Sequence, residues 1–206
     1  MRIAVIVYGR LNHCSITYDK IMDSLGKEND IDFFLSSDNS SESLLNEFCL
    51  LYKPVLYNNN PVYYDTDLSI YPGKYEVTNL HNMTCHFINK NRVFVLLEDY
   101  INKNNINYDV VVCLRIDCII NNKFTFNNLE DNTIYIPSGY DYVDNAINDQ
   151  IAYGKVDVMK KYNSLNPKEL LEKKLSILHP ESLNLANIRY YNLRVVRTEL
   201  NYYLCR

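Results

Sequence analysis

Residues 108–117 are Tyr-Asp-Val-Val-Val-Cys-Leu-Arg-Ile-Asp, an apolar run that ends in an arginine and a carboxylate two positions apart. The uninterrupted hydrophobic stretch 110–114 predicts a strand that is buried on both faces of a sheet. Charge at the end of such a strand is costly unless it is paired or meets a ligand. In open α/β sheets, ligands bind at the carboxyl ends of the strands. Arg115 and Asp117 are therefore the first candidates for a functional site.

Length and composition limit the classes of protein that fit this chain. Its 206 residues suffice for one α/β domain with a substantial core, so we expect a single domain over residues 1–206. Nucleic-acid binders are usually basic, whereas this chain has a net charge of −4, so we expect no nucleic-acid partner. No apolar run approaches the ~20 residues of a membrane span. Residues 1–7 predict a first strand and not a signal peptide.

The chain has six cysteines, and none of them forms a CxxC pair. This spacing argues against a zinc site. Several of the cysteines lie in apolar surroundings, where a free thiol behaves as a small hydrophobic group. We therefore expect reduced thiols and a cytoplasmic location.

Strands and helices alternate in the first half of the sequence. The hydrophobic patterns predict strands over 3–8, 31–35, 54–57, 110–114 and 133–137, and helices over 15–25, 44–51 and 81–103. This order predicts an α/β fold: a mostly parallel, Rossmann-like sheet flanked by helices.

The later segments are less periodic. Residues 58–80 predict a long loop of the kind that covers a site. Residues 148–162 begin with polar side chains and predict a helix further on, and 168–178 predict another amphipathic helix. Terminal strands are expected over 190–197 and 202–205.

The turn after the first strand is the second candidate for a ligand contact. Gly9 allows a ligand to approach the backbone closely, and Arg10 suits phosphate recognition. Neither GxGxxG nor GxxxxGK[ST] is present, so dinucleotide and P-loop interpretations lack support. A simple turn with a solvated arginine explains the same residues equally well.

Alternation along an extended segment places Arg115 and Asp117 on the same side. The carboxylate suits a hard divalent cation that bridges two phosphates. The arginine suits a phosphate, or it holds the aspartate in place. A structural ion pair that closes the end of the strand is the alternative explanation.

Asp149, in the segment Asn-Asp-Gln-Ile-Ala-Tyr-Gly at 148–154, is the third candidate. Near the start of a predicted helix it suits an N-cap or first-turn acid. The functional alternative is a carboxylate that accepts a proton from a hydroxyl group.

Weaker candidates complete the set. Residues 65–67 form a literal Asp-Thr-Asp, but within the predicted loop and not after a hydrophobic strand. His179, before a proline, is a candidate metal ligand or phosphate contact, or a surface histidine. His81 and His86 lie on the predicted long helix, where we expect neither to have a metal-ligand partner four residues further on.

Taken in order, these segments resemble the small GT-A-type glycosyltransferase-like proteins. The matching segments are Val-Tyr-Gly-Arg-Leu at 7–11, Ile-Asp-Phe-Phe-Leu-Ser-Ser at 31–37, the helix at 86–100, Tyr-Asp-Val-Val-Val-Cys-Leu-Arg-Ile-Asp at 108–117, Asn-Asp-Gln-Ile-Ala-Tyr-Gly at 148–154, and Pro-Glu at 180–181.

The resemblance implies transfer of a sugar from a UDP-, GDP- or dTDP-sugar to a glycan, protein or lipid-linked acceptor. Tyr8, Gly9 and Arg10 would contact the nucleotide. Asp117 would face the diphosphate and Mn²⁺ or Mg²⁺. His179, singled out above from its own sequence context, is the candidate for a further metal ligand.

The resemblance implies Asp149 and Asp117 as the catalytic residues, and Arg115 as a donor-binding residue. Asp149 would act as general base toward the acceptor. Arg115 stands where the family has a first metal-binding aspartate, so it could offset the diphosphate charge without a metal.

The alternative function is a non-catalytic carbohydrate- or nucleotide-binding module on the same fold. The 19 tyrosines fit such a module, because aromatic rings stack on sugars. A nucleotidyltransferase would need more basic residues near Gly9 than the sequence contains.

Overall fold

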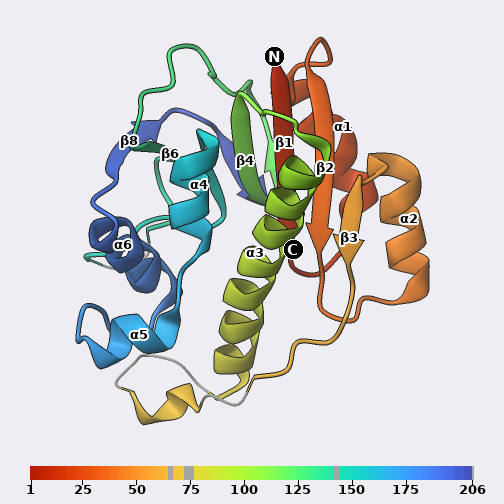
Figure 1. The fold of residues 1–206 in the computed structure, drawn as a ribbon. Helices are drawn as coiled ribbons and strands as arrows, with labels where there is room; N and C mark the ends of the chain where they lie inside the picture. Colours follow the sequence, from red (N-terminus) through yellow and green to blue (C-terminus); the bar gives the residue numbers. More distant parts are fainter. Residues whose placement is uncertain (65–66, 72–76, 142–143, 206) are drawn as a thin grey trace.

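The computed structural model describes residues 1–64, 67–71, 77–141 and 144–205, and a seven-stranded sheet crosses this part of the chain (Figure 1). The strand order is β3-β2-β1-β4-β7-β6-β8. The strands are β1 (Arg2–Tyr8), β2 (Asp30–Ser36), β3 (Leu56–Asn58), β4 (Val110–Arg115), β6 (Thr133–Pro137), β7 (Ile151–Gly154) and β8 (Arg194–Thr198). Only β7 among them runs antiparallel to its neighbours. The predicted mostly parallel α/β sheet is confirmed.

Helices cover both faces of the sheet (Figure 1). Helices α1 (Cys14–Leu25) and α2 (Glu42–Tyr52) lie on one face; α3 (Val77–Asn104), α4 (Val156–Asn163) and α6 (Pro180–Tyr190) lie on the other. The short helix α5 (Pro167–Glu172) packs beside α6. A small sheet of β5 (Cys118–Ile120) and β9 (Tyr202–Leu204) adds to the α1 face. A 3-10 turn, η1 (Leu68–Ile70), precedes α3.

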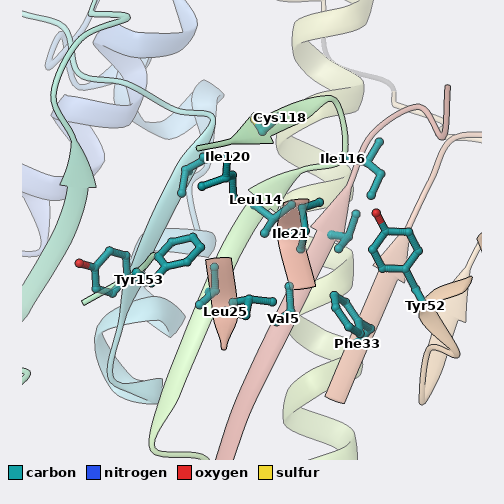
Figure 2. Packing of buried hydrophobic residues seen from close by; sticks show 14 of the residues in the cluster. Val5, Ile21, Leu25, Phe33, Tyr52, Leu114, Ile116, Cys118, Ile120 and Tyr153 are labelled. Carbon is teal, nitrogen blue, oxygen red and sulfur yellow. The ribbon is translucent and has the colours of Figure 1, made fainter. Parts of the chain in front are cut away.

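Successive side chains of β1 point to opposite faces of the sheet, so this strand contributes to both hydrophobic cores. Ile3, Val5 and Val7 pack on the α1 face, whereas Ala4 and Ile6 pack on the α3 face. Figure 2 shows the first of these cores, where β1, β2 and β4 contribute Val5, Phe33 and Leu114. Burial of a strand on both faces produces the continuous apolar runs that the sequence shows.

The predictions for the second half of the chain were partly wrong. Residues 151–154 form a strand within the segment predicted as a helix start, and the helix begins only at Val156. The predicted helix over 168–178 ends at Glu172, and helix α6 over 180–190 was not predicted. The strand expected over 190–197 overlaps β8, which starts four residues later. A four-residue buried strand carries too little periodicity to be distinguished from a helix.

The predicted loop over 58–80 is also shorter than expected. It contains η1, and α3 begins at Val77 instead of residue 81. Asp67 caps η1, since its Oδ1 accepts a hydrogen bond from the Ser69 amide at 2.9 Å. Asp65 and Thr66, the rest of the literal DxD, lie outside the described residues.

Candidate functional site

A cavity of about 320 Å³ opens at the carboxyl ends of β1, β2 and β4, against α3. Strands β2 and β4 lie on opposite sides of β1, so this is the point where the strand order reverses. Ligands of open α/β sheets bind at such points. The lining residues are Tyr8, Gly9, Arg10, Asn12, His13, Asp38, Asn82, Cys85, His86, Asn89, Arg115, Ile116, Asp117 and Cys205. The structure thus brings five predicted residues to one cavity: Tyr8, Gly9, Arg10, Arg115 and Asp117.

Bare backbone borders the cavity at Gly9. Its φ of +101° is unfavourable for any residue with a Cβ. A Cβ built there would meet no described atom within 4 Å, so the space beside it is open. The Gly9 amide is held by the Ser36 carbonyl at 3.1 Å, and the Arg10 guanidinium donates to Asn82 Oδ1 at 3.1 Å.

Arg115 and Asp117 form a bidentate ion pair at the cavity wall. Arg115 Nε donates to Asp117 Oδ1 at 3.0 Å, and Nη2 donates to Oδ2 at 2.6 Å. Burial lowers the pKa of the guanidinium, but the Asp117 carboxylate outweighs it and the net pKa is raised. The ion pair that was the alternative explanation of this motif is therefore present in the structure. The Arg115 side chain is 35% exposed and the Asp117 side chain is 20% exposed.

Asp149 lies behind this wall and does not line the cavity. It precedes β7, so the expectation of a helix N-terminus was wrong. The adjacent Gln150 carbonyl accepts from the Arg115 amide at 3.0 Å, and the Asp149 carbonyl accepts from the Tyr8 hydroxyl at 2.8 Å. Asp149 is only 5% exposed. These contacts fix its backbone beside the ends of β1 and β4.

His86 separates the Asp149 carboxylate from the cavity. The histidine lines the cavity, and its Nε2 lies 3.5 Å from Asp149 Oδ2. That nitrogen has no hydrogen bond among the described residues. Burial raises the pKa of Asp149, although Lys90 and Arg115 oppose the rise, and burial holds the pKa of His86 well below its usual range.

Lys90 is a buried cation beside this pair that the sequence analysis missed. It is 1% exposed, with its Nζ 3.3 Å from Asn184 Oδ1 and 3.5 Å from the centroid of the Tyr162 ring. Burial lowers its pKa to about 8. The sequence did indicate that Lys90 is buried. It lies three, four and seven residues before Val93, Phe94 and Leu97, which places it on the apolar face of the helix.

His179 lies at the start of α6 and is not part of the cavity lining. It is 7% exposed, with Nδ1 3.2 Å from Glu181 Oε2 and 3.4 Å from Ser182 Oγ. Arg115 holds both oxygens of Asp117. Among the described residues, neither His179 nor Asp117 belongs to a group of three potential metal ligands. Metal binding by Asp117 and His179 stays a prediction.

The described residues contain one such group: Asp38, His81 and Cys85. Cys85 lies four residues after His81 on α3, so the expectation that His81 has no partner there was wrong. The i, i+4 spacing was visible in the sequence, but Asp38 joins the pair only through the fold. None of the helices in the described ranges combines the length and apolar character that a bilayer crossing requires.

No protein-family model matches this sequence, and no curated protein matches it. Among solved structures it is similar to the galactosyltransferase LgtC in complex with donor and acceptor sugar analogs. The TM-score is 0.55 at 13% identity, over 94% of this chain and 72% of that one. An active-site mutant of LgtC gives the same figures. At this identity the likeness concerns the fold alone: the chain shares with LgtC a GT-A-like α/β architecture built on a mostly parallel sheet.

Proposed function

We propose that this protein transfers a sugar from a nucleotide-diphosphate sugar to a glycan, protein or lipid-linked acceptor. The observation that carries the proposal is the cavity at the strand-order reversal, bordered by the bare backbone of Gly9 and by Arg10 and Arg115. Support comes from the shared fold with a galactosyltransferase whose structure contains donor and acceptor analogs.

The arginines give the cavity its expected preference for a diphosphate. Arg115 is oriented by Asp117, so its guanidinium is ready to stabilise the negative charge of the leaving nucleotide. Arg10 and the Gly9 backbone would contact the nucleotide. Each Asp117 oxygen accepts one hydrogen bond from Arg115, so Mn²⁺ or Mg²⁺ at Asp117 would share the carboxylate with the guanidinium. We assign the charge stabilisation to Arg115, which is already in place.

Asp149 is the proposed general base for the acceptor hydroxyl. Burial raises the pKa of its carboxyl, which strengthens it as a proton acceptor. His86 lies between Asp149 and the cavity, so a reaction through Asp149 requires the imidazole to move.

Calorimetry with UDP-, GDP- and dTDP-sugars, with and without Mn²⁺, tests donor binding. We expect one nucleotide to bind the wild type and Asp117→Asn to abolish turnover. Asp30→Asn is the matched control, since Asp30 also pairs with an arginine but lies 68% exposed outside the cavity. The proposal fails if no donor binds, and the role of Asp117 fails if Asp117→Asn turns over like the wild type.

A non-catalytic binding module on the same fold is the second candidate. Two observations favour it: Arg115 occupies both Asp117 oxygens, and the Asp149 carboxylate lies outside the cavity. Product analysis separates the two functions. Donor binding without transfer or donor hydrolysis would assign the module.

A further inference from the structure

A three-ligand cluster lies at the rim of the cavity, separate from the Arg115–Asp117 pair. His81 and Cys85 project from the same face of α3, and His81 Nε2 is 3.5 Å from Cys85 Sγ. Asp38, which follows β2, completes the group, and one ligand atom from each residue lies within 4.8 Å of the others.

Neighbouring residues hold two of these ligands in place. The Tyr64 hydroxyl is 3.0 Å from His81 Nδ1, which leaves Nε2 directed toward Cys85. The Val62 amide donates to Asp38 Oδ1 at 2.8 Å, which fixes the carboxylate. Hydrogen bonds of this kind orient the ligands of metal sites and fix the tautomer of the imidazole.

We propose that Asp38, His81 and Cys85 bind a transition-metal ion of the Zn²⁺ class. Ligands bonded to a tetrahedral zinc ion at about 2.0–2.3 Å lie roughly 3.5 Å apart, which the His81–Cys85 distance already matches. A thiolate, an imidazole and a carboxylate together favour zinc over Mg²⁺ or Mn²⁺, which prefer oxygen ligands. The site is therefore chemically distinct from any divalent ion at a donor diphosphate.

The position of the cluster gives the ion a structural consequence. It would join the first turns of α3 to the segment after β2, two parts of the chain that are far apart in sequence. Asp38 and Cys85 line the cavity, and His81 is exposed, so the ion has a route of entry. Three protein ligands leave a fourth tetrahedral position for water or a cavity ligand.

Titration of the reduced, metal-free full chain with Co²⁺, a spectroscopic substitute for Zn²⁺, tests the site. We expect one equivalent to bind with thiolate-to-cobalt charge-transfer absorption and tetrahedral visible bands, and Zn²⁺ to displace it. Cys85→Ser should remove the charge-transfer absorption. His81→Gln and Asp38→Asn should weaken binding at least about tenfold.

Cys205→Ser is the matched control, because Cys205 lines the same cavity outside the cluster. It should bind Co²⁺ as the wild type does. A second measurement uses thermal unfolding: at the same Zn²⁺ concentration, the Tm of the wild type should rise more than that of His81→Gln, whose exposed position leaves the fold intact. Absence of the charge-transfer absorption, its survival in Cys85→Ser, or its loss in Cys205→Ser would overturn the proposal. None of these results depends on sugar transfer.

Discussion

Gly9 and Gly139 share a backbone conformation but not a location. Their φ angles are +101° and +89°, and a Cβ at either would meet no described atom within 4 Å. Alanine at each position should cost about 1–2 kcal/mol through backbone strain alone. Only Gly9 borders the cavity, so only Gly9→Ala should also weaken donor binding. Urea unfolding and donor calorimetry on both variants measure the two effects separately.

Equal weakening of donor binding by Gly9→Ala and Gly139→Ala would contradict this assignment. Such a result would show that the loss follows from destabilisation of the fold. Unchanged binding in Gly9→Ala would instead move the ligand away from the first turn of the sheet.

Lys90 should make the stability of the fold depend on pH in an unusual direction. Burial lowers its pKa to about 8 from the ordinary 10.5. Between these values the unfolded chain binds the proton and the folded chain does not, so the contribution of Lys90 to stability rises with pH. Below about pH 8 both states are protonated and the buried charge carries its full cost.

Comparison with Lys90→Met isolates this contribution from the cysteines and tyrosines that titrate in the same range. The free energy of unfolding of the wild type, relative to Lys90→Met, should increase by up to about 3 kcal/mol from pH 8 to pH 10.5. Urea unfolding of both proteins across this range provides the measurement. A constant difference would show that Lys90 keeps an ordinary pKa in the folded protein.

At the scale of the elements, Asn148 connects three parts of the fold. Its buried Nδ2 donates to the carbonyls of Pro137 and Gly139, at the end of β6, and to the Tyr202 hydroxyl of β9 at 2.7 Å. Its Oδ1 accepts from the Gln150 amide at 2.9 Å, next to β7. This amide therefore secures the small β5–β9 sheet to the main one.

Tyr202→Phe tests that connection. The Tyr202 hydroxyl donates to Gln150 Oε1 at 2.9 Å as well as accepting from Asn148 Nδ2, so its removal deprives the buried Gln150 oxygen of this donor, while Asn148 Nδ2 keeps its two carbonyl acceptors. The expected cost is about 1–3 kcal/mol in urea unfolding. Tyr203→Phe, at the neighbouring, 49% exposed position, should change nothing measurable. Equal effects of the two substitutions would disprove the connecting role.

The sequence predicted the elements whose periodicity is strong. Residues 133–137 and the helix end at Gly26 coincide with β6 and α1, because apolar patterns and a positive-φ glycine act locally. Strand β7 and helix α6 were missed for physical reasons. The first is only four residues long, and buried polar side chains such as Asn184 and Asn187 interrupt the apolar face of the second.

The candidate site was predictable to a similar extent. Gly9 follows β1 and Arg115 ends β4, so sheet topology alone places them at one edge. The position of His86 in front of Asp149 depends on how α3 packs across the sheet, and no local pattern encodes this. The proximity of Asp38 to His81 and Cys85 also depends on tertiary packing, which no local sequence pattern encodes.

At the scale of the whole molecule, the cysteines divide by burial into two classes. Cys14, Cys85, Cys113 and Cys118 are buried, whereas Cys49 and Cys205 are partly exposed. A thiol reagent should therefore label Cys49 and Cys205 rapidly in the metal-free native protein. Cys14, Cys113 and Cys118, which are buried away from the cavity, should react only as fast as the structure opens. Mass spectrometry of labelled peptides measures this, and rapid native labelling of Cys113 or Cys118 would contradict the compact core.

The central place of β1 in the sheet has a consequence for synthesis on the ribosome. One edge of β1 pairs with β2 soon after both emerge, but its other edge pairs with β4, whose register begins at Ile3 opposite Val110. Until residues 110–115 leave the exit tunnel, the nascent chain presents an open strand edge in which residues 3–7 are all apolar. Such edges are templates for intermolecular pairing. Translation through the long α3 segment is thus the interval in which chaperone protection matters most for this chain.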